Sequence, residues 1–135
     1  MVKVVIDTNI WISAIFFGGK LATILNAWKR EDFLAVFSQE TFLELENKLM
    51  HWGKKLGSEK EAAEYLLSIN RHALFFYPQK KFEISRDSKD NKFLDVSFAA
   101  DAKYLVSGDK DLLELNSIGR TKIISPRVFI ERLKR

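Results

Sequence analysis

The fold is inferred from the run Val2-Lys3-Val4-Val5-Ile6-Asp7-Thr8-Asn9. Four of its first five residues are β-branched aliphatics, and so short an apolar run is typical of a buried parallel strand rather than a helix. The run ends at Asp7. Because the carboxyl ends of parallel strands line the ligand crevice of an open α/β sheet, we expect Asp7 where functional groups gather. Taken alone, Asp7 is equally well explained as a helix cap, while Thr8 and Asn9 can cap the next helix or orient the carboxylate.

Apolar runs and amphipathic segments alternate along the rest of the chain, which predicts an α/β fold with a parallel sheet and helices on both faces. Further strands are expected at 33–37, 75–77, 104–106 and 121–125. Helices are expected at 10–17, at 21–28, from Ser38 to an exit marked by Gly53 and Gly57, and at 58–75, 93–100, 112–115 and 126 onward. Ser38 is placed to cap its helix, and Pro126 suits a first helical turn.

The composition is that of one folded domain spanning residues 1–135. Hydrophobic residues make up 47% and charged residues 30% of the chain, which argues against disorder. Cysteine is absent, which excludes disulfide scaffolds, thiol nucleophiles and zinc–thiolate sites and agrees with a cytoplasmic location. No apolar run approaches the roughly 18 residues of a membrane span, and the immediate start of the first strand leaves no room for a signal peptide.

Acidic residues follow two of the predicted strands. Asp7 ends the first strand, and Asp109 follows the strand at 104–106, with Gly108 beside it to allow a tight turn. Asp90 begins the helix that leads into that second strand. If the two strands are neighbours, these three carboxylates converge in one crevice. Glu44 can join them if its helix packs its second turn over the same edge, although a glutamate on a long helix is usually solvated.

Such a cluster of carboxylates persists only if a cation neutralises it, and no arginine in these motifs offsets the charge. Ligands that are all oxygen select a hard cation, Mg²⁺ or Mn²⁺. A carboxylate-bound divalent ion supports in-line phosphoryl displacement, so phosphodiester hydrolysis is the reaction class predicted. The two histidines, His51 and His72, lack a partner ligand at helical spacing and are expected to be structural or solvated.

The overall charge suggests a polyanionic partner. The chain has 22 Lys and Arg against 18 Asp and Glu, for a net charge of +4. When the four clustered acids are set aside, 14 acids remain, so the rest of the surface is distinctly basic. An acidic metal site with a basic rim suits a nucleic-acid backbone, which binds largely through neutralisation of its phosphates.

Four sequence blocks together resemble the PIN-domain ribonucleases. They are V-V-I-D-T-N at 4–9, S-Q-E-T-F-L-E at 38–44, D-N-K-F-L at 90–94 and L-V-S-G-D-K-D-L-L at 105–113, and they span nearly the whole chain. The likeness is greatest to the prokaryotic VapC-like branch, the toxins of toxin–antitoxin pairs. The resemblance implies a three-layer α/β/α sandwich with a mainly parallel, about five-stranded sheet. It also implies an Mg²⁺- or Mn²⁺-dependent endoribonuclease that forms a homodimer or dimer of dimers and is silenced by a cognate antitoxin.

The resemblance assigns the metal-binding and catalytic acids to Asp7, Glu44, Asp90 and Asp109. Further candidates are Thr8 and Asn9, which match the family's polar residues after the first acid, and Ser107, where such proteins commonly have Thr. Asp111 is either an outer ligand or only a helix cap. Asp87 and Asp95 flank the third acid and are alternatives to Asp90 for its role, but Asp95 lies about 140° around a helix from Asp90 and should not share its face.

Two other interpretations stay open. The first is a catalytically idle PIN-like module that binds RNA or a protein partner, because a normal set of acids does not guarantee turnover. The second is a receiver-like or phosphatase-like α/β domain with an acidic Mg²⁺ pocket. This second possibility is disfavoured because the chain lacks the expected mid-chain phosphoacceptor at a strand end and the late lysine of that class.

Overall fold

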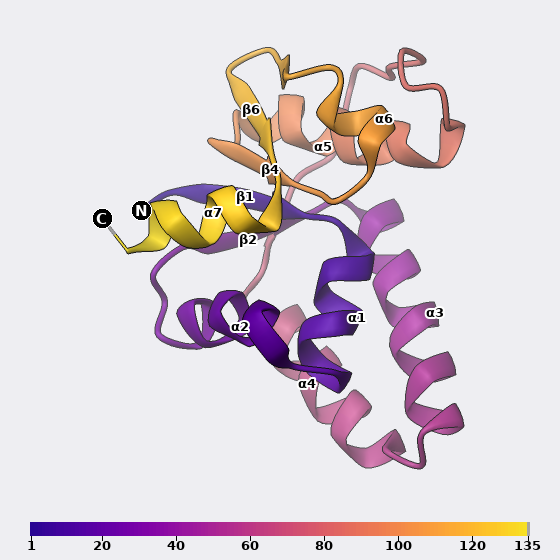
Figure 1. Ribbon diagram of the computed structural model, residues 1–135. Coiled ribbons are helices and arrows are strands. Elements are labelled where there is room, and N and C mark those ends of the chain that lie inside the picture. Colours follow the sequence, from indigo (N-terminus) through magenta and orange to yellow (C-terminus); the bar gives the residue numbers. More distant parts are fainter. Residues whose placement is uncertain (135) are drawn as a thin grey trace.

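A six-stranded sheet lies between two layers of helices in the computed structural model, which describes residues 1–134 (Figure 1). The strands are β1 Lys3–Ile6, β2 Leu34–Phe37, β3 Leu74–Phe75, β4 Tyr104–Val106, β5 Ser117–Ile118 and β6 Thr121–Ile124. Their order across the sheet is β3-β2-β1-β4-β6-β5, and every neighbouring pair is parallel except β5 with β6. The mainly parallel α/β sandwich is therefore confirmed.

The sheet has one strand more than the five expected from the sequence. The additional strand, β5, has two residues and forms an antiparallel hairpin with β6, in which Ile118 pairs with Thr121. Gly119 takes a positive φ of 57° in the connecting turn, as the left-handed backbone conformation there requires. A two-residue strand contains no apolar run to detect, so its pairing depends on β6 rather than on a pattern of its own.

The helices are α1 Thr8–Phe16, α2 Ala22–Lys29, α3 Gln39–Lys55, α4 Glu59–His72, α5 Asn91–Ala100, α6 Lys110–Leu113 and α7 Pro126–Leu133, with short 3₁₀ turns at Gly19–Leu21 and Ser88–Asp90. Ser38 caps α3 as predicted, through a reciprocal pair of hydrogen bonds with Thr41, and Pro126 lies in the first turn of α7. The helix expected at 58–75 ends at His72, because Leu74 and Phe75 pair with β2.

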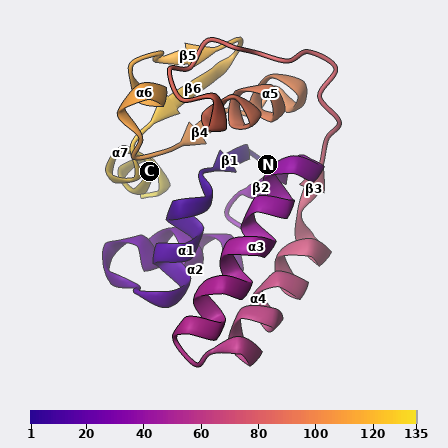
Figure 2. The same cartoon turned by 90° about the vertical axis from the view of Figure 1, so that its right-hand side faces the viewer.

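Two hydrophobic layers hold the helices to opposite faces of the sheet. In β1, Val4 and Ile6 pack with α1, α2, α3, α4 and α7, whereas Val5 packs with α5 and α6. Figures 1 and 2 show this division, with α5 and α6 above the sheet and α1, α2, α3 and α4 below it. A strand buried on both faces needs apolar residues throughout, which explains the unbroken run Val4-Val5-Ile6.

Within residues 1–134, no single helix combines the length and apolar content of a membrane span. One bent pair, Thr8–Phe16 with Gly19–Lys29, meets the requirement by length and composition, with a bend of 103° between its two parts.

Candidate metal centre

The parallel pairing of β1 with β4 brings two strand-end acids to the same edge of the sheet. Ile6 is in register with Val106, and the backbone N–H of Asp7 donates to the Val106 carbonyl oxygen at 2.9 Å. Asp109 follows three residues after Val106. Helix α5, which packs on the same face of the sheet as α6, begins at this edge immediately after Asp90. The face onto which these elements open is the one that Figure 2 presents to the viewer.

Ser107 connects the two strand-end acids. Its hydroxyl is fully buried, donates to Asp7 Oδ2 at 2.8 Å and accepts from the backbone N–H of Asp109 at 3.0 Å. Asp7 Oδ1 accepts from the backbone N–H of Asn9 at 3.1 Å and caps α1, and Asp109 Oδ1 accepts from the Asp111 N–H at 2.8 Å and caps α6. Both acids are therefore helix caps, and the same bonds fix their carboxylates at the edge of the sheet.

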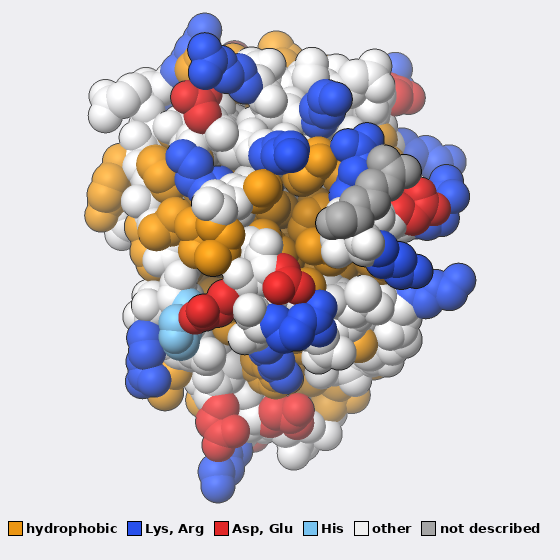
Figure 3. Space-filling model, turned by 90° about the vertical axis from the view of Figure 1, so that its left-hand side faces the viewer, with side chains coloured by type: hydrophobic (Ala, Val, Ile, Leu, Met, Phe, Trp, Pro, Cys, Tyr) orange, Lys and Arg blue, Asp and Glu red, His pale blue; other side chains and the backbone are white. Residues whose placement is uncertain are grey.

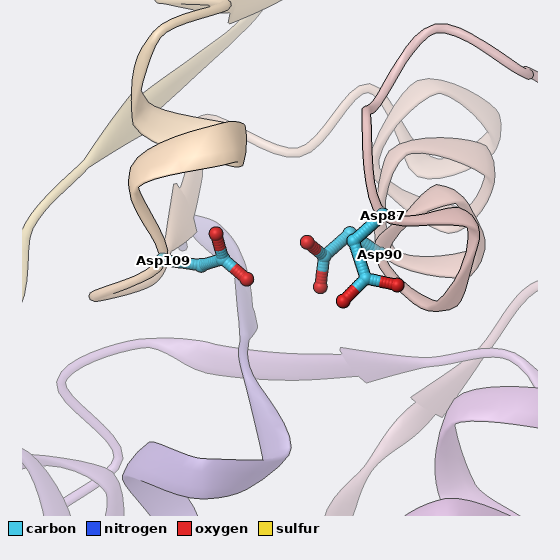
Figure 4. Close-up of side chains that lie close together, drawn as sticks. All are labelled: Asp87, Asp90 and Asp109. Atoms are coloured by element: carbon cyan, nitrogen blue, oxygen red, sulfur yellow. The ribbon is translucent and has the colours of Figure 1, made fainter.

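Three aspartates form a compact carboxylate cluster at this edge (Figure 4). Asp87, Asp90 and Asp109 each offer an oxygen atom, and these oxygens all lie within 4.8 Å of one another. Figure 4 shows Asp109 pointing across a gap toward Asp87 and Asp90, which come from the segment leading into α5. Asp90 Oδ2 is buried and has no hydrogen-bond partner among the residues that the structure describes.

The sequence leaves open which of Asp87, Asp90 and Asp95 is the third ligand, and the structure places Asp87 in the cluster together with Asp90. The feature of the sequence that could have indicated this is the spacing of three residues between Asp87 and Asp90. Asp87 caps the 3₁₀ turn Ser88–Asp90 by accepting from the Lys89 N–H at 3.0 Å. In a 3₁₀ turn, side chains three residues apart lie on the same side, so Asp87 and Asp90 face the same space. That conformation is not evident from a polar stretch rich in Lys and Asp.

Burial and mutual repulsion disfavour the charged forms of these acids. Burial raises the pKa of Asp90 to about 7, and contact with Asp109 and the charges of Asp87 and Asp7 act in the same direction. Burial also raises the pKa of Asp7, against the opposing hydrogen bonds from Ser107 and Asn9. The site thus contains more carboxylate charge than its surroundings stabilise.

Glu44 also reaches this region, but its charge is compensated. Burial tends to raise its pKa, yet hydrogen bonds from Lys92 and Thr8 and the nearby lysine charges outweigh burial, and the pKa of Glu44 falls below its usual value. Glu44 Oε2 lies 2.6 Å from Lys92 Nζ. Lys48, one turn further along α3, donates to Asn9 Oδ1 at 3.1 Å. The sequence motifs contain no arginine to offset the acids, and the structure supplies lysines instead.

The remaining candidates lie outside the cluster of Asp87, Asp90 and Asp109. Asp95 is buried elsewhere on α5, where Oδ1 accepts from the Phe82 N–H at 2.7 Å and Oδ2 lies 3.9 Å from Lys81 Nζ. Asp111 was considered as a helix cap. The residue that caps α6 is instead Asp109, whose side chain accepts a hydrogen bond from the backbone N–H of Asp111. Gly108 has no positive φ, so the turn beside Asp109 does not depend on the conformational freedom of glycine.

The donor set fits a hard divalent cation. Asp87, Asp90 and Asp109 offer carboxylate oxygens only, which suits Mg²⁺ or Mn²⁺ rather than a softer metal. The unpartnered buried oxygen of Asp90 is the observation that points to a ligand, because buried polar atoms are nearly always paired. A bound cation would satisfy this oxygen and relieve the repulsion that raises the pKa of Asp90.

Comparison with known proteins gives three findings. A family model described as PIN domain matches residues 3–111. An uncharacterized protein of the archaeon Methanocaldococcus jannaschii, MJ1680, is 29% identical over 148 aligned positions, which cover 99% of this chain and 93% of that protein. The crystal structure of PAE2754 from Pyrobaculum aerophilum superposes with a TM-score of 0.62 at 18% identity, covering 99% of this chain and 90% of the other. This structural likeness shows the fold alone.

Proposed function

Because this chain belongs to the PIN-domain family, we propose that it is an Mg²⁺- or Mn²⁺-dependent endoribonuclease. Family membership supports nuclease activity, and the structure adds an acidic cluster suited to a divalent cation. The observation that carries the proposal is the meeting of Asp87, Asp90 and Asp109 at the carboxyl edge of the sheet, with a buried Asp90 oxygen left unpartnered.

The proposed roles follow from the contacts of each side chain. Asp7, Asp90 and Asp109 hold the cation, with Glu44 beside them and Asp87 as an additional ligand. Ser107 orients both strand-end carboxylates through its two hydrogen bonds. When bound, the cation supplies charge neutralisation and Lewis-acid activation for in-line displacement at a phosphate. Thr8 contacts Glu44, and Asn9 fixes both Asp7 and Lys48, so each supports the geometry of the ligands.

RNA is the proposed substrate, single-stranded or structured. The support is the resemblance to PIN-domain ribonucleases and the excess of basic residues outside the cluster. Lys81, Arg86 and Lys89 are exposed in the segment that leads into the acidic site, where they can meet phosphates. The biological role we propose is that of a cytoplasmic toxin, a homodimer or dimer of dimers, controlled by a cognate antitoxin. Exposed apolar side chains such as Phe17 and Leu43 offer contact area for such partners.

One observation favours the alternative of an idle PIN-like module. The charge of Glu44 is already satisfied by Lys92, so one of the four acids expected from the family is less available to a cation than the others. Under this alternative the protein binds RNA or a protein partner without cleaving it.

Incubation of purified protein with single-stranded RNA and Mn²⁺, beside Asp7→Asn, tests the nuclease proposal. We expect Asp7→Asn to lower the cleavage rate at least about 100-fold, because one charged ligand is lost. Asp101→Asn is the matched control. Asp101 is an exposed acid at the opposite end of α5 with a positive φ of 49°, a conformation that asparagine adopts readily. Equal cleavage by wild type and Asp7→Asn would place the activity in a contaminant or another site. Tight RNA binding with no turnover in any divalent ion would favour the idle module.

A further inference from the structure

The ion pair between Glu44 and Lys92 joins the two helical layers beside the acidic cluster. Glu44 belongs to α3 and Lys92 to α5, and their charged atoms lie 2.6 Å apart. The side chains are only 24% and 11% exposed, respectively. A lysine so little exposed is unusual unless it is paired, and here the paired group is one of the acids expected to bind the cation.

The ammonium group of Lys92 is held in place by further contacts. It donates to the backbone carbonyl oxygen of Lys89 and lies 5.3 Å from the centre of the Phe93 ring. Charge-assisted hydrogen bonds in a mostly buried setting are stronger than exposed ones. The pair is therefore a defined structural contact rather than a surface ion pair of negligible strength.

We propose that Lys92 is a positioning residue that withholds Glu44 from the divalent cation and thereby lowers the affinity of the site for that cation. The inference rests on the proposed function. A carboxylate bonded to an ammonium group has less charge and fewer free lone pairs for a cation. Pairing with Lys92 and coordination of the cation by Glu44 are therefore linked equilibria, and each weakens the other to the same extent.

The pair of Glu44 and Lys92 lies where Lys92 and the cation can compete directly for the Glu44 carboxylate. Lys92 follows Asp90 by two residues, and the charge of Glu44 contributes to raising the pKa of Asp7. Glu44 is thus near enough to the cation ligands to interact with them, while its own charge is compensated by Lys92. Removal of the ammonium group would make Glu44 available and add one negative charge to the site.

The test is titration of the full-length protein with Mn²⁺ alone, by calorimetry or electron paramagnetic resonance. We expect Lys92→Met to bind Mn²⁺ about tenfold more tightly than wild type. Glu44→Gln alone should change the wild-type affinity by less than about threefold, since a paired carboxylate contributes little. The double variant Glu44→Gln/Lys92→Met should bind Mn²⁺ about as tightly as wild type, because it removes one charge of each sign and leaves no carboxylate to be released. A merely structural Lys92 would predict the opposite sign, because its loss would loosen the site.

Lys103→Met is the matched control, since it removes an exposed lysine between α5 and β4, at the end of α5 away from the acidic cluster. We expect it to leave the Mn²⁺ affinity within about twofold of wild type. If Lys92→Met fails to fold, the Mn²⁺ affinity of Glu44→Gln still tests the inference. A tenfold loss of affinity in that variant would show Glu44 to be a full ligand and would overturn the inference. Unchanged or weaker binding by folded Lys92→Met would also overturn it. Absence of Mn²⁺ binding by every protein, wild type included, would overturn the proposed function as well.

Discussion

Asp90 shows how a single buried acid ties the stability of this protein to pH. Its carboxyl group is 6% exposed, and burial beside Asp109 raises its pKa to about 7. An aspartate in the unfolded chain titrates near 3.9. Between these two values the folded protein keeps a proton that the unfolded chain has lost. Stability contributed by Asp90 is therefore complete below about pH 4 and declines as the pH rises toward about 7.

Asp90→Asn is predicted to stabilise the protein at pH 8 by about 2 kcal/mol in the absence of divalent ions, because it removes the cost of ionising a buried carboxyl group. At pH 4.5 the aspartate is already protonated in the folded state, so the two proteins should be about equally stable. Urea unfolding in the presence of EDTA at both pH values measures the difference. The same stability gain at both pH values would contradict the assignment of the raised pKa to Asp90.

At the scale of elements, α3 depends on close contact with α4 to place Glu44. The two helices pack side by side, and a Cβ atom added at Gly53 would lie only 2.7 Å from the Cβ of Ala62. Gly53 was interpreted from sequence as a marker of the helix exit, whereas it lies inside α3, which continues to Lys55. The absence of a side chain at Gly53 permits the approach of α4.

Gly53→Ala is predicted to destabilise the protein by about 1 kcal/mol or more. The helix propensity gained on replacing glycine, about 1 kcal/mol, is outweighed by overpacking of two helix backbones that no rotamer change can relieve. Gly108→Ala is the control, since a Cβ there meets nothing within 4 Å. Thermal unfolding of both variants checks the expectation. A Gly53→Ala protein more stable than wild type would show that α3 and α4 separate at little cost.

At the scale of the whole molecule, two faces at opposite ends of the strands differ in chemistry. The acidic cluster lies at the carboxyl ends of β1 and β4. The face at the amino ends, shown in Figure 3, has a broad area of hydrophobic side chains, with charged side chains of both signs among and around them. Two hollows on that side, of about 290 and 630 Å³, share Phe33 in their lining. The acidic cluster itself would repel a polyanion, so the proposed RNA substrate must be held by basic residues around the site.

RNA binding by the non-cleaving Asp7→Asn variant is predicted to weaken at least about tenfold between 50 and 200 mM salt, because each neutralised phosphate releases condensed counterions. Fluorescence anisotropy with a short single-stranded RNA gives the dissociation constants. The variant should be compared with Asp101→Asn in Ca²⁺, to show that the salt dependence does not arise from the substitution at Asp7. Binding that is insensitive to salt would indicate recognition without phosphate contacts.

Much of the architecture could be predicted because it depends on local patterns. The β-branched runs of β1 and β6 identify buried strands, and parallel pairing places Asp7 and Asp109 at one edge once β1 and β4 are neighbours. The cap at Ser38 and the proline at 126 are short-range signals of the same kind. In contrast, β5 has two residues, and its pairing depends on β6, so no pattern in its own sequence indicates it.

The sequence by itself therefore determined the mainly parallel α/β fold and the acids that end its strands, because hydrophobic periodicity and residue order specify them. Only the tertiary structure decided that Asp87 joins the cluster, that Asp95 binds the segment around Phe82, and that Lys92 pairs with Glu44. These outcomes depend on how α3 and α5 approach each other from opposite faces of the sheet. Contacts between side chains 48 residues apart, as in the pair of Glu44 and Lys92, follow from that packing. They produce no periodic pattern in the sequence from which they could be predicted.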